Sequence, residues 1–195
     1  MTIQRYTRTA MALHWIIAAL IFANVALGLS ADHLPDDWIR PAIDLHKSFG
    51  ITVLGLAAMR VLWRVTHPAP PLPASYPGWE RWSAHAAHGI LYLLIFCLPL
   101  SGWAHDSAWK AAASHPVYLY GVIPWPRIGW LVAIDPDRKD HWHDLLGQVH
   151  VAFGYVLYAM VGAHVLGALK HQWLDREPEL QRMLPGDAGA DGTAL

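Results

Sequence analysis

The fold is decided by the stretch QVHVAFGYVLYAMVGAHVLGAL at residues 148–169, an apolar run that carries two histidines, His150 and His164. Each residue of an α-helix turns by about 100° and rises by about 1.5 Å. The fourteen-residue spacing therefore returns the second imidazole to within roughly 40° of the first and moves it about 21 Å along the axis. An unsatisfied imidazole in hydrocarbon is costly, and an intramembrane ionisable residue indicates function. The stretch predicts one membrane-spanning helix with two polar rings on one face, each in need of a partner.

The composition of the whole chain supports a membrane setting. Its 195 residues are 54% hydrophobic and only 15% charged, against about 25% charged in soluble domains. A net charge of −1 gives no basic face, which argues against nucleic acid as a partner. Cys97 is the only cysteine, so the chain forms no internal disulfide and has no CxxCH motif for covalent haem attachment. The composition predicts an integral membrane protein whose redox metal, if any, is held by residues other than cysteine.

Four apolar segments have the length that spans a bilayer. We expect helices at about residues 10–29, 46–65, 84–103 and 148–169. Together they predict an all-α fold, an integral membrane four-helix bundle, as one domain over residues 1–185. Residues 186–195 are expected to form a disordered C-terminal tail.

The positive charges predict the orientation. If the N-terminus is inside, the inner segments hold eight Lys and Arg against six acids, and the outer segments hold six against nine. This excess follows the positive-inside rule, so we expect a multi-pass membrane protein with both termini in the cytoplasm. The outer connections are then an acidic loop at 30–45 and a long loop at 105–147. A proline-rich loop at 66–82 lies inside.

This topology pairs the histidines by depth. The first helix begins near His14 on the inner side, and the second begins at His46 on the outer side. The last helix runs inward from His150 to His164. Haem iron takes two axial ligands, and neutral imidazole supplies them well. The sequence predicts two b-type haems stacked across the bilayer, with His46 and His150 at the outer haem and His14 and His164 at the inner one.

Small residues would give a flat ring room between helices. The pattern H-x-x-F-G occurs at 46–50 and again at 150–154, which places Gly50 and Gly154 one turn past the outer histidines on the same face. We expect both glycines to pack against a haem. A simpler alternative stays open: each histidine could be an interhelical hydrogen-bond partner, and each glycine could promote ordinary helix packing.

Other polar side chains allow more than one interpretation. His85 and His88 begin the third helix and could contact a quinone headgroup, a haem propionate or another helix, or join a metal site. Arg60 and Arg64 lie one turn apart near the inner end of the second helix, where they could pair with haem propionates or reach the membrane surface. The cluster DHWHD at 140–144 could bind a divalent cation weakly or remain a solvated loop.

A series of motifs along nearly the whole chain carries a family resemblance. In order they are YTRTAMALHW (6–15), DLHKSFGI (44–51), RVLWR (60–64), HAAHGILYLL (85–94), the two histidines of 148–169, and LQRMLP (180–185). In these motifs the chain resembles the bacterial di-haem cytochrome b561 family. The resemblance implies axial ligation by His14, His46, His150 and His164. It also implies a place in the bacterial inner membrane and electron transfer between the quinone pool and a periplasmic partner.

The resemblance implies two haem b groups as cofactors and ubiquinone or another quinone as exchangeable substrate. With both axial positions filled, the iron has no open site for oxygen, so an outer-sphere electron-transfer oxidoreductase is expected. A similar family member is a superoxide oxidase, which is the alternative activity. The acidic outer segments favour instead a cationic periplasmic electron-transfer protein, with Lys47 as a local exception. An alternative of another class is a non-haem metal-binding or structural membrane subunit.

Overall fold

Four long helices make up most of the chain. The computed structural model describes residues 4–73 and 75–185, and the tail predicted at 186–195 lies outside the described residues. The long helices are α1 (Arg8–Ser30), α2 (Asp36–Thr66), α3 (Gly78–Ser107) and α5 (Pro136–Trp173). Each is long and apolar enough to cross a membrane. This confirms the predicted all-α fold with four membrane helices.

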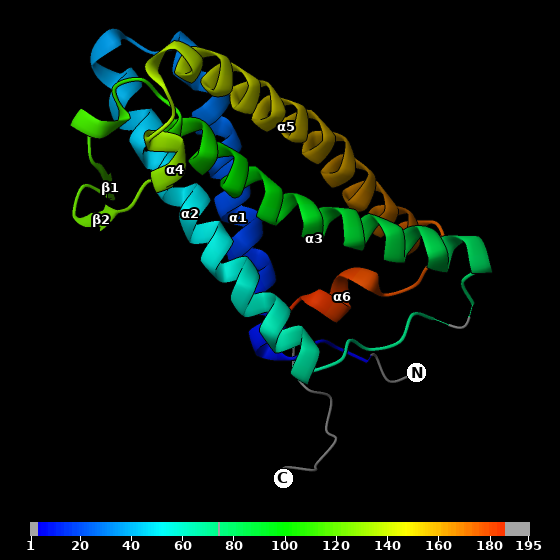
Figure 1. Cartoon of the computed structure of the whole chain (residues 1–195). Coiled ribbons are helices and arrows are strands. Elements are labelled where there is room, and N and C mark those ends of the chain that lie inside the picture. The colour runs from blue at the N-terminus through cyan, green and yellow to red at the C-terminus, as the bar shows by residue number, and fades with distance from the viewer. Residues whose placement is uncertain (1–3, 74, 186–195) are drawn as a thin grey trace.

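Short elements connect the long helices (Figure 1). The turn between α1 and α2 contains the 3-10 helix η1 (Ala31–His33). The segment between α3 and α5 contains η2 (Ala112–Ser114), an antiparallel pair of strands, β1 (Val117–Leu119) and β2 (Ile123–Trp125), and the short helix α4 (Gly129–Val132). After α5 the chain forms α6 (Glu179–Met183).

Two of the long helices begin well before the predicted spans. Residues 36–45 belong to α2 and residues 136–147 belong to α5. The loops expected at 30–45 and 105–147 are therefore shorter than predicted. Hydropathy marks the apolar middle of a membrane helix, whereas its start in the interface is polar.

Local chemistry explains both early starts. Asp36 and Asp37 stand in the first turn of α2, where a carboxylate interacts favourably with the helix dipole. At α5 the side chain of Asp135 caps the helix by accepting a hydrogen bond from the amide of Asp137. Pro136 follows the cap, in the first helical position, where its missing N–H costs nothing.

The long helices associate in two pairs. α1 packs on α2, α3 packs on α5, and α2 joins the pairs through α3. Figure 1 shows the pairs close together where the α1–α2 turn and the segment between α3 and α5 lie, and diverging toward the opposite end. We call the first the loop end. The opposite end, where α1 begins and α5 ends, is the terminal end.

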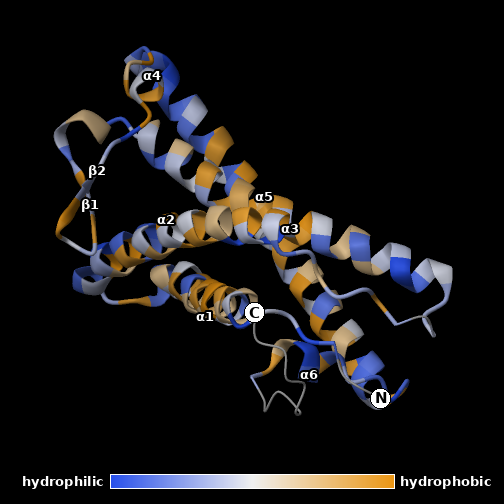
Figure 2. Ribbon diagram, turned by 90° about the horizontal axis from the view of Figure 1, so that it is seen from below, coloured by the Kyte–Doolittle hydropathy of each residue, from blue (hydrophilic) through white to orange (hydrophobic). Residues whose placement is uncertain are grey.

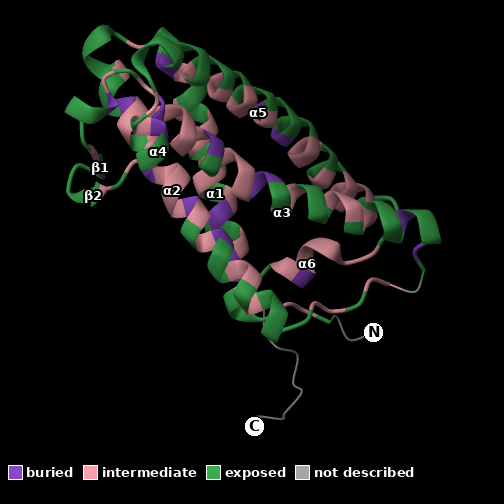
Figure 3. Ribbon diagram, viewed as in Figure 1, coloured by how far each residue is buried: buried purple, intermediate pink, exposed green. Residues whose placement is uncertain are grey.

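Most of the helix surface is not covered by protein. Only 6% of the most apolar window of α5 is buried inside the structure, and 22% of that of α3. Figure 2 shows hydrophobic residues along the long helices and hydrophilic ones at their ends and on α6, and Figure 3 shows exposed residues along the outer sides. The exposed apolar side chains include Phe22, Leu62, Tyr155 and Leu166. Such a surface suits hydrocarbon, in which helices satisfy their own backbone hydrogen bonds.

A polar cluster joins α3, α5 and α6 at the terminal end. The ammonium of Lys170 lies 2.5 Å from Glu80 of α3 and 2.8 Å from Asp175. The hydroxyl of Tyr76, just before α3, donates to Glu179 of α6 at 2.9 Å. Withdrawal from water and this bond to Glu179 raise the pKa of the Tyr76 hydroxyl. The cluster holds the C-terminal segment against the ends of the helices.

Candidate functional site

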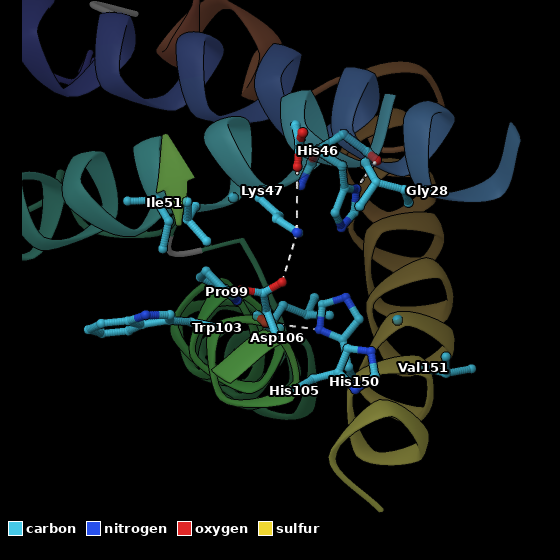
Figure 4. A pocket seen from close by; sticks show the side chains of 18 of the residues that line it. Gly28, His46, Lys47, Ile51, Pro99, Trp103, His105, Asp106, His150 and Val151 are labelled. Atoms are coloured by element: carbon cyan, nitrogen blue, oxygen red, sulfur yellow. Dashed lines mark hydrogen bonds and ion pairs between the residues drawn. The ribbon is translucent and has the colours of Figure 1, made fainter. Parts of the chain in front are cut away.

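Two histidines from different helices face each other at the loop end. The rings of His46 on α2 and His150 on α5 have centroids 6.1 Å apart and planes at 81°. Both residues line a cavity of about 780 Å³ between the helices. Figure 4 shows the two rings on opposite walls of this cavity. The structure thus brings together the two histidines that the sequence placed at the outer level.

Hydrogen bonds to neighbouring groups orient both rings. Nδ1 of His46 donates to the carbonyl of Asn24 at 2.9 Å, and Nδ1 of His150 donates to the carbonyl of Leu98 at 3.0 Å. The hydroxyl of the buried Ser101 also lies 3.1 Å from Nδ1 of His150. A neutral imidazole that donates through Nδ1 keeps its lone pair on Nε2. Both rings are therefore held in the tautomer whose Nε2 can bind a metal.

Two glycines give these rings their space, and neither was predicted. A Cβ on Gly28 of α1 would lie 3.1 Å from Cε1 of His46, and a Cβ on Gly102 of α3 would lie 3.1 Å from Cε1 of His150. The predicted Gly50 and Gly154 line the cavity but do not touch the rings. Each contact glycine lies on a different helix from its histidine, so no local sequence pattern could have indicated it.

A second pair of histidines lies at the terminal end. The rings of His14 on α1 and His164 on α5 have centroids 6.3 Å apart and planes at 77°. The ring of His88 on α3 lies 5.2 Å from that of His164. In the part of the chain that the structure describes, the ring nitrogens of His14, His88 and His164 have no hydrogen-bond partner. The two pairs therefore differ in how their rings are held.

The structure separates the two histidines of HAAH. Both side chains are exposed on α3, but the ring of His88 contacts that of His164 and so joins the terminal-end group. Arg60 donates through Nε to the hydroxyl of Tyr92 at 3.1 Å and through Nη1 to the carbonyl of Ala10 at 3.1 Å. Arg60 thereby lies against α1 and α3, close to the level of His14 and His164.

Arg64 lies farther toward the helix end than Arg60. Its guanidinium carbon is 5.7 Å from the ring centroid of Tyr6, a cation–π contact at the surface of the terminal end. Arg60 therefore reaches between the helices, and Arg64 packs on the segment before α1.

The DHWHD cluster is helical and does not gather its histidines. His141 and His143 are two positions apart, so they face different sides of α5. The ring of His143 stacks on His105 of α3 with centroids 3.8 Å apart, and each Nδ1 donates to the carbonyl of the other residue. Parallel stacked rings do not direct their nitrogens at a common point, so this contact does not resemble a metal site.

The polar cluster of the terminal end holds the one described group with the spacing of three metal ligands. Atoms of Glu80, His171 and Asp175 lie within 4.8 Å of one another. The ammonium of Lys170 already pairs with both carboxylates. It therefore occupies the position that a cation would take.

Charged side chains border the cavity beside His46. Nζ of Lys47 lies 2.7 Å from Oδ1 of Asp106, a pair that crosses from α2 to α3 in Figure 4. Oδ2 of Asp106 accepts a hydrogen bond from Nε of Arg127 at 2.9 Å. Arg127 also donates through Nη1 to the carbonyls of Ala112 and His115. One buried carboxylate thus receives two cations and ties the segment between α3 and α5 to the cavity.

Both ring pairs have the separation of two axial ligands. An imidazole nitrogen lies about 2 Å from a bound transition metal, so two rings on opposite sides of one ion have centroids about 6 Å apart. The distances of 6.1 and 6.3 Å agree with this value. At the loop end, two buried atoms of cavity-lining residues, Asn24 Oδ1 and Trp125 Nε1, have no hydrogen-bond partner among the described residues. This site fits a flat metal-bearing group with polar substituents.

Comparisons with known proteins agree over nearly the whole chain. The model of the family described as prokaryotic cytochrome b561 matches residues 5–186. "Cytochrome b561 homolog 2" of Escherichia coli (strain K12) is 34% identical over 193 residues, which cover 97% of this chain and 96% of that protein.

Two more distant relatives match at similar length. "Probable superoxide oxidase CybB" of Yersinia pestis is 25% identical over 189 residues, covering 95% of this chain and 99% of the relative. "Cytochrome b561 homolog 1" of Escherichia coli (strain K12) is 24% identical over 183 residues, covering 93% and 97%. The similarity therefore extends over all four long helices.

Proposed function

Because the chain belongs to the prokaryotic cytochrome b561 family, we propose that it is a di-haem membrane cytochrome that carries electrons between the quinone pool and a periplasmic partner. Membership itself makes the chain a multi-pass bacterial membrane electron-transfer protein with b-type haem. The observation that supports two haems is the pair of facing imidazoles at each end of the bundle.

We assign His46 and His150 as axial ligands of the loop-end haem and His14 and His164 as ligands of the terminal-end haem. Each pair comes from two helices, so the haems lie between helices and tie them together. Gly28 and Gly102 leave the loop-end rings room, and Gly50 and Gly154 line the cavity that holds the macrocycle.

The haems supply one-electron chemistry, and the protein's residues keep it outer-sphere. With two histidine ligands, each bound haem iron would have no open coordination site for oxygen. The carbonyls of Asn24 and Leu98 fix the orientation and raise the basicity of the loop-end ligands through their Nδ1 bonds. A ligand set that is held in place needs little rearrangement when the electron arrives or leaves.

The two proposed haem sites lie at different depths in the bilayer. His150 and His164 lie about 21 Å apart along one helix. This distance is most of the thickness of a hydrocarbon core, which is about 30 Å. From the charge bias of the sequence we place the terminal end, with both chain termini, in the cytoplasm of a bacterium and the loop end in the periplasm. Haems held by both histidine pairs would supply a path for electrons between the two membrane faces.

Quinone exchange fits the terminal end better than the loop end. His88 lies against the ring of His164, so a headgroup bonded to His88 would lie beside the terminal-end haem. His85 lies one turn nearer the surface. Arg60 reaches between the helices at this level and is the better placed of the two arginines to meet a propionate, with Arg64 nearer the surface.

At the periplasmic face we propose a cationic electron-transfer protein as the partner. Asp32, Asp36 and Asp37 lie at the α1–α2 turn, and Asp135, Asp137 and Asp140 lie at the start of α5. Both groups belong to the loop end, and their negative charge would attract a basic partner.

A second candidate is superoxide:ubiquinone oxidoreductase activity. Two observations favour it: a relative carries the name probable superoxide oxidase, and the cations Lys47 and Arg127 border the loop-end cavity. Stopped-flow reduction of the oxidised protein by superoxide and by quinol separates the candidates, because a superoxide oxidase accepts electrons from superoxide at a rate that competes with spontaneous dismutation.

The visible spectrum of the purified protein tests the proposal as a whole. Dithionite reduction should produce the sharp α and Soret bands of b-type haem, split by the presence of two unlike sites. A spectrum without these bands would leave the non-haem or purely structural membrane subunit as the better account.

A further inference from the structure

The loop-end cavity contains hydrogen-bond donors that the axial ligation does not use. The ammonium of Lys47 has three N–H bonds and one close partner, Asp106 at 2.7 Å, with Asp44 at 3.6 Å as a weaker one. The indole N–H of Trp125 is buried and has no partner among the described residues. Both residues line the cavity that His46 and His150 border.

Contacts with α3 hold Lys47 and the segment that carries Trp125. Asp106 receives Lys47 on Oδ1 and Arg127 on Oδ2, and Arg127 follows Trp125 by two residues. Trp125 is also held against α3, because its ring contacts Trp103, whose indole donates to the carbonyl of Pro126. The donors are thus fixed at the side of the cavity where α2, α3 and the end of β2 meet.

At this edge of the cavity, two cations share a single carboxylate. Lys47 and Arg127 bring two positive charges to Asp106, whose side chain is only 12% exposed. The other acid near Lys47 is Asp44, which is 46% exposed and lies 3.5 Å from Arg40. Since a buried N–H donor without a partner is costly, and since an ammonium bonds most strongly to a charged acceptor, an anionic oxygen suits both Trp125 and Lys47.

We propose that Lys47 and Trp125 together bind one anionic oxygen group at the edge of the loop-end cavity. The group is either a propionate carboxylate of the haem or a free small anion of the same chemistry. This inference rests on the proposed function, because it places the anion beside a haem held by His46 and His150. Arg127 keeps its structural bond to Asp106 when the site fills.

The test is a potentiometric titration of the purified haem-loaded protein and of two variants, Lys47→Gln and Trp125→Phe. Neither change orphans a buried carboxylate, because Arg127 still pairs with Asp106. Matched controls are Lys110→Gln, at a lysine that is 71% exposed, and Trp130→Phe, at a tryptophan that is 66% exposed in the same segment. Haem content and thermal stability are measured on every variant, and formate serves as the probe for a free anion.

A bound propionate predicts that both variants lower the midpoint potential of the haem that His150→Ala removes, without any added anion. Loss of a compensating positive charge or donor favours the oxidised, more positive haem. A free anion predicts a saturable formate dependence of that potential in the parent protein, weakened at least about tenfold in both variants, which is about 1.4 kcal/mol of binding.

Unchanged potentials in both variants together with no formate dependence would overturn the anion site while leaving the two haems intact. If only one variant has an effect, the shared site is wrong. A parent protein without b-type haem bands would instead contradict the proposed function, so the two failures are distinguishable.

Discussion

The hydroxyl of Ser101 on α3 lies 3.1 Å from Nδ1 of His150 on α5 and donates to the carbonyl of Leu98, which also accepts from that ring. Ser101 therefore acts on the axial ligand through a hydrogen bond, without reaching the metal. We predict that Ser101→Ala keeps both haems and raises the potential of the loop-end haem, because the imidazole loses an acceptor and becomes a less basic ligand.

A redox titration with paired haem quantitation checks this prediction. Ser114→Ala is the matched control, since Ser114 is exposed and bonds within its own turn. A shift of the terminal-end haem in Ser101→Ala, or an equal shift in the control, would contradict the positioning role.

The close contact of Gly28 with His46 and of Gly102 with His150 gives a second prediction. A Cβ at either position lies 3.1 Å from a ring carbon, so Gly28→Ala or Gly102→Ala must displace the ring. Overpacking of this kind costs about 1–3 kcal/mol. We expect a lower thermal unfolding temperature and partial loss of the loop-end haem.

Gly78→Ala is the control for these glycines, because a Cβ on Gly78 meets no atom within 4 Å. The measurements are haem content per chain and thermal unfolding in detergent. Full haem occupancy at normal stability in both Gly28→Ala and Gly102→Ala would show that the rings have more freedom than this packing allows.

The different positions of His88 and His85 give a third prediction. The ring of His88 lies 5.2 Å from the ring of His164, whereas His85 lies one turn nearer the start of the same helix. His88→Ala should alter the band position and potential of the terminal-end haem and slow its reduction by quinol, while His85→Ala should do so much less. Equal effects of both changes, or an effect of His88→Ala on the loop-end haem, would argue against this placement.

The terminal-end cluster predicts a sensitivity to alkaline pH. The pKa of Tyr76 is raised above its ordinary value of 10.0 by burial and by its bond to Glu179. Below that value both folded and unfolded chains hold the proton and the stabilisation is complete. Above it the unfolded chain releases the proton first, so the contribution of Tyr76 falls as pH rises toward the folded-state pKa.

Thermal unfolding between pH 9 and about 11 measures this effect. Tyr76→Phe should lower stability at neutral pH, because the bond to Glu179 is lost, and should reduce the alkaline decline. Tyr118→Phe, at a tyrosine that is 47% exposed, should leave the decline unchanged. A decline of the same slope in Tyr76→Phe would assign the alkaline effect to other groups.

The sequence could predict the membrane fold because apolar runs report directly on lipid contact. The same patterns located the four helices but missed their polar beginnings, since residues 36–45 and 136–147 are helical without being apolar. The segment between α3 and α5 was predicted as a long loop, and its strands were missed. Its two strands contain only three residues each, too few for a recognisable alternation.

The pairing of the histidines could also be predicted, because depth follows from topology and spacing. The residues that surround the rings could not be predicted. Gly28, Gly102 and Ser101 act across helix interfaces, on histidines that belong to other helices. Trp125 lies in a segment whose path over α2 and α3 depends on the Asp106 contacts. Such contacts have no signature in a single sequence.

The most direct test of the central claim is the haem content of single ligand variants. The parent protein should bind two haems per chain. His46→Ala and His150→Ala should each leave one haem with the same spectrum and potential, and His14→Ala and His164→Ala should each leave the other. If His46→Ala and His150→Ala remove different haems, or if neither removes one, the assignment of facing histidine pairs to two haems is wrong.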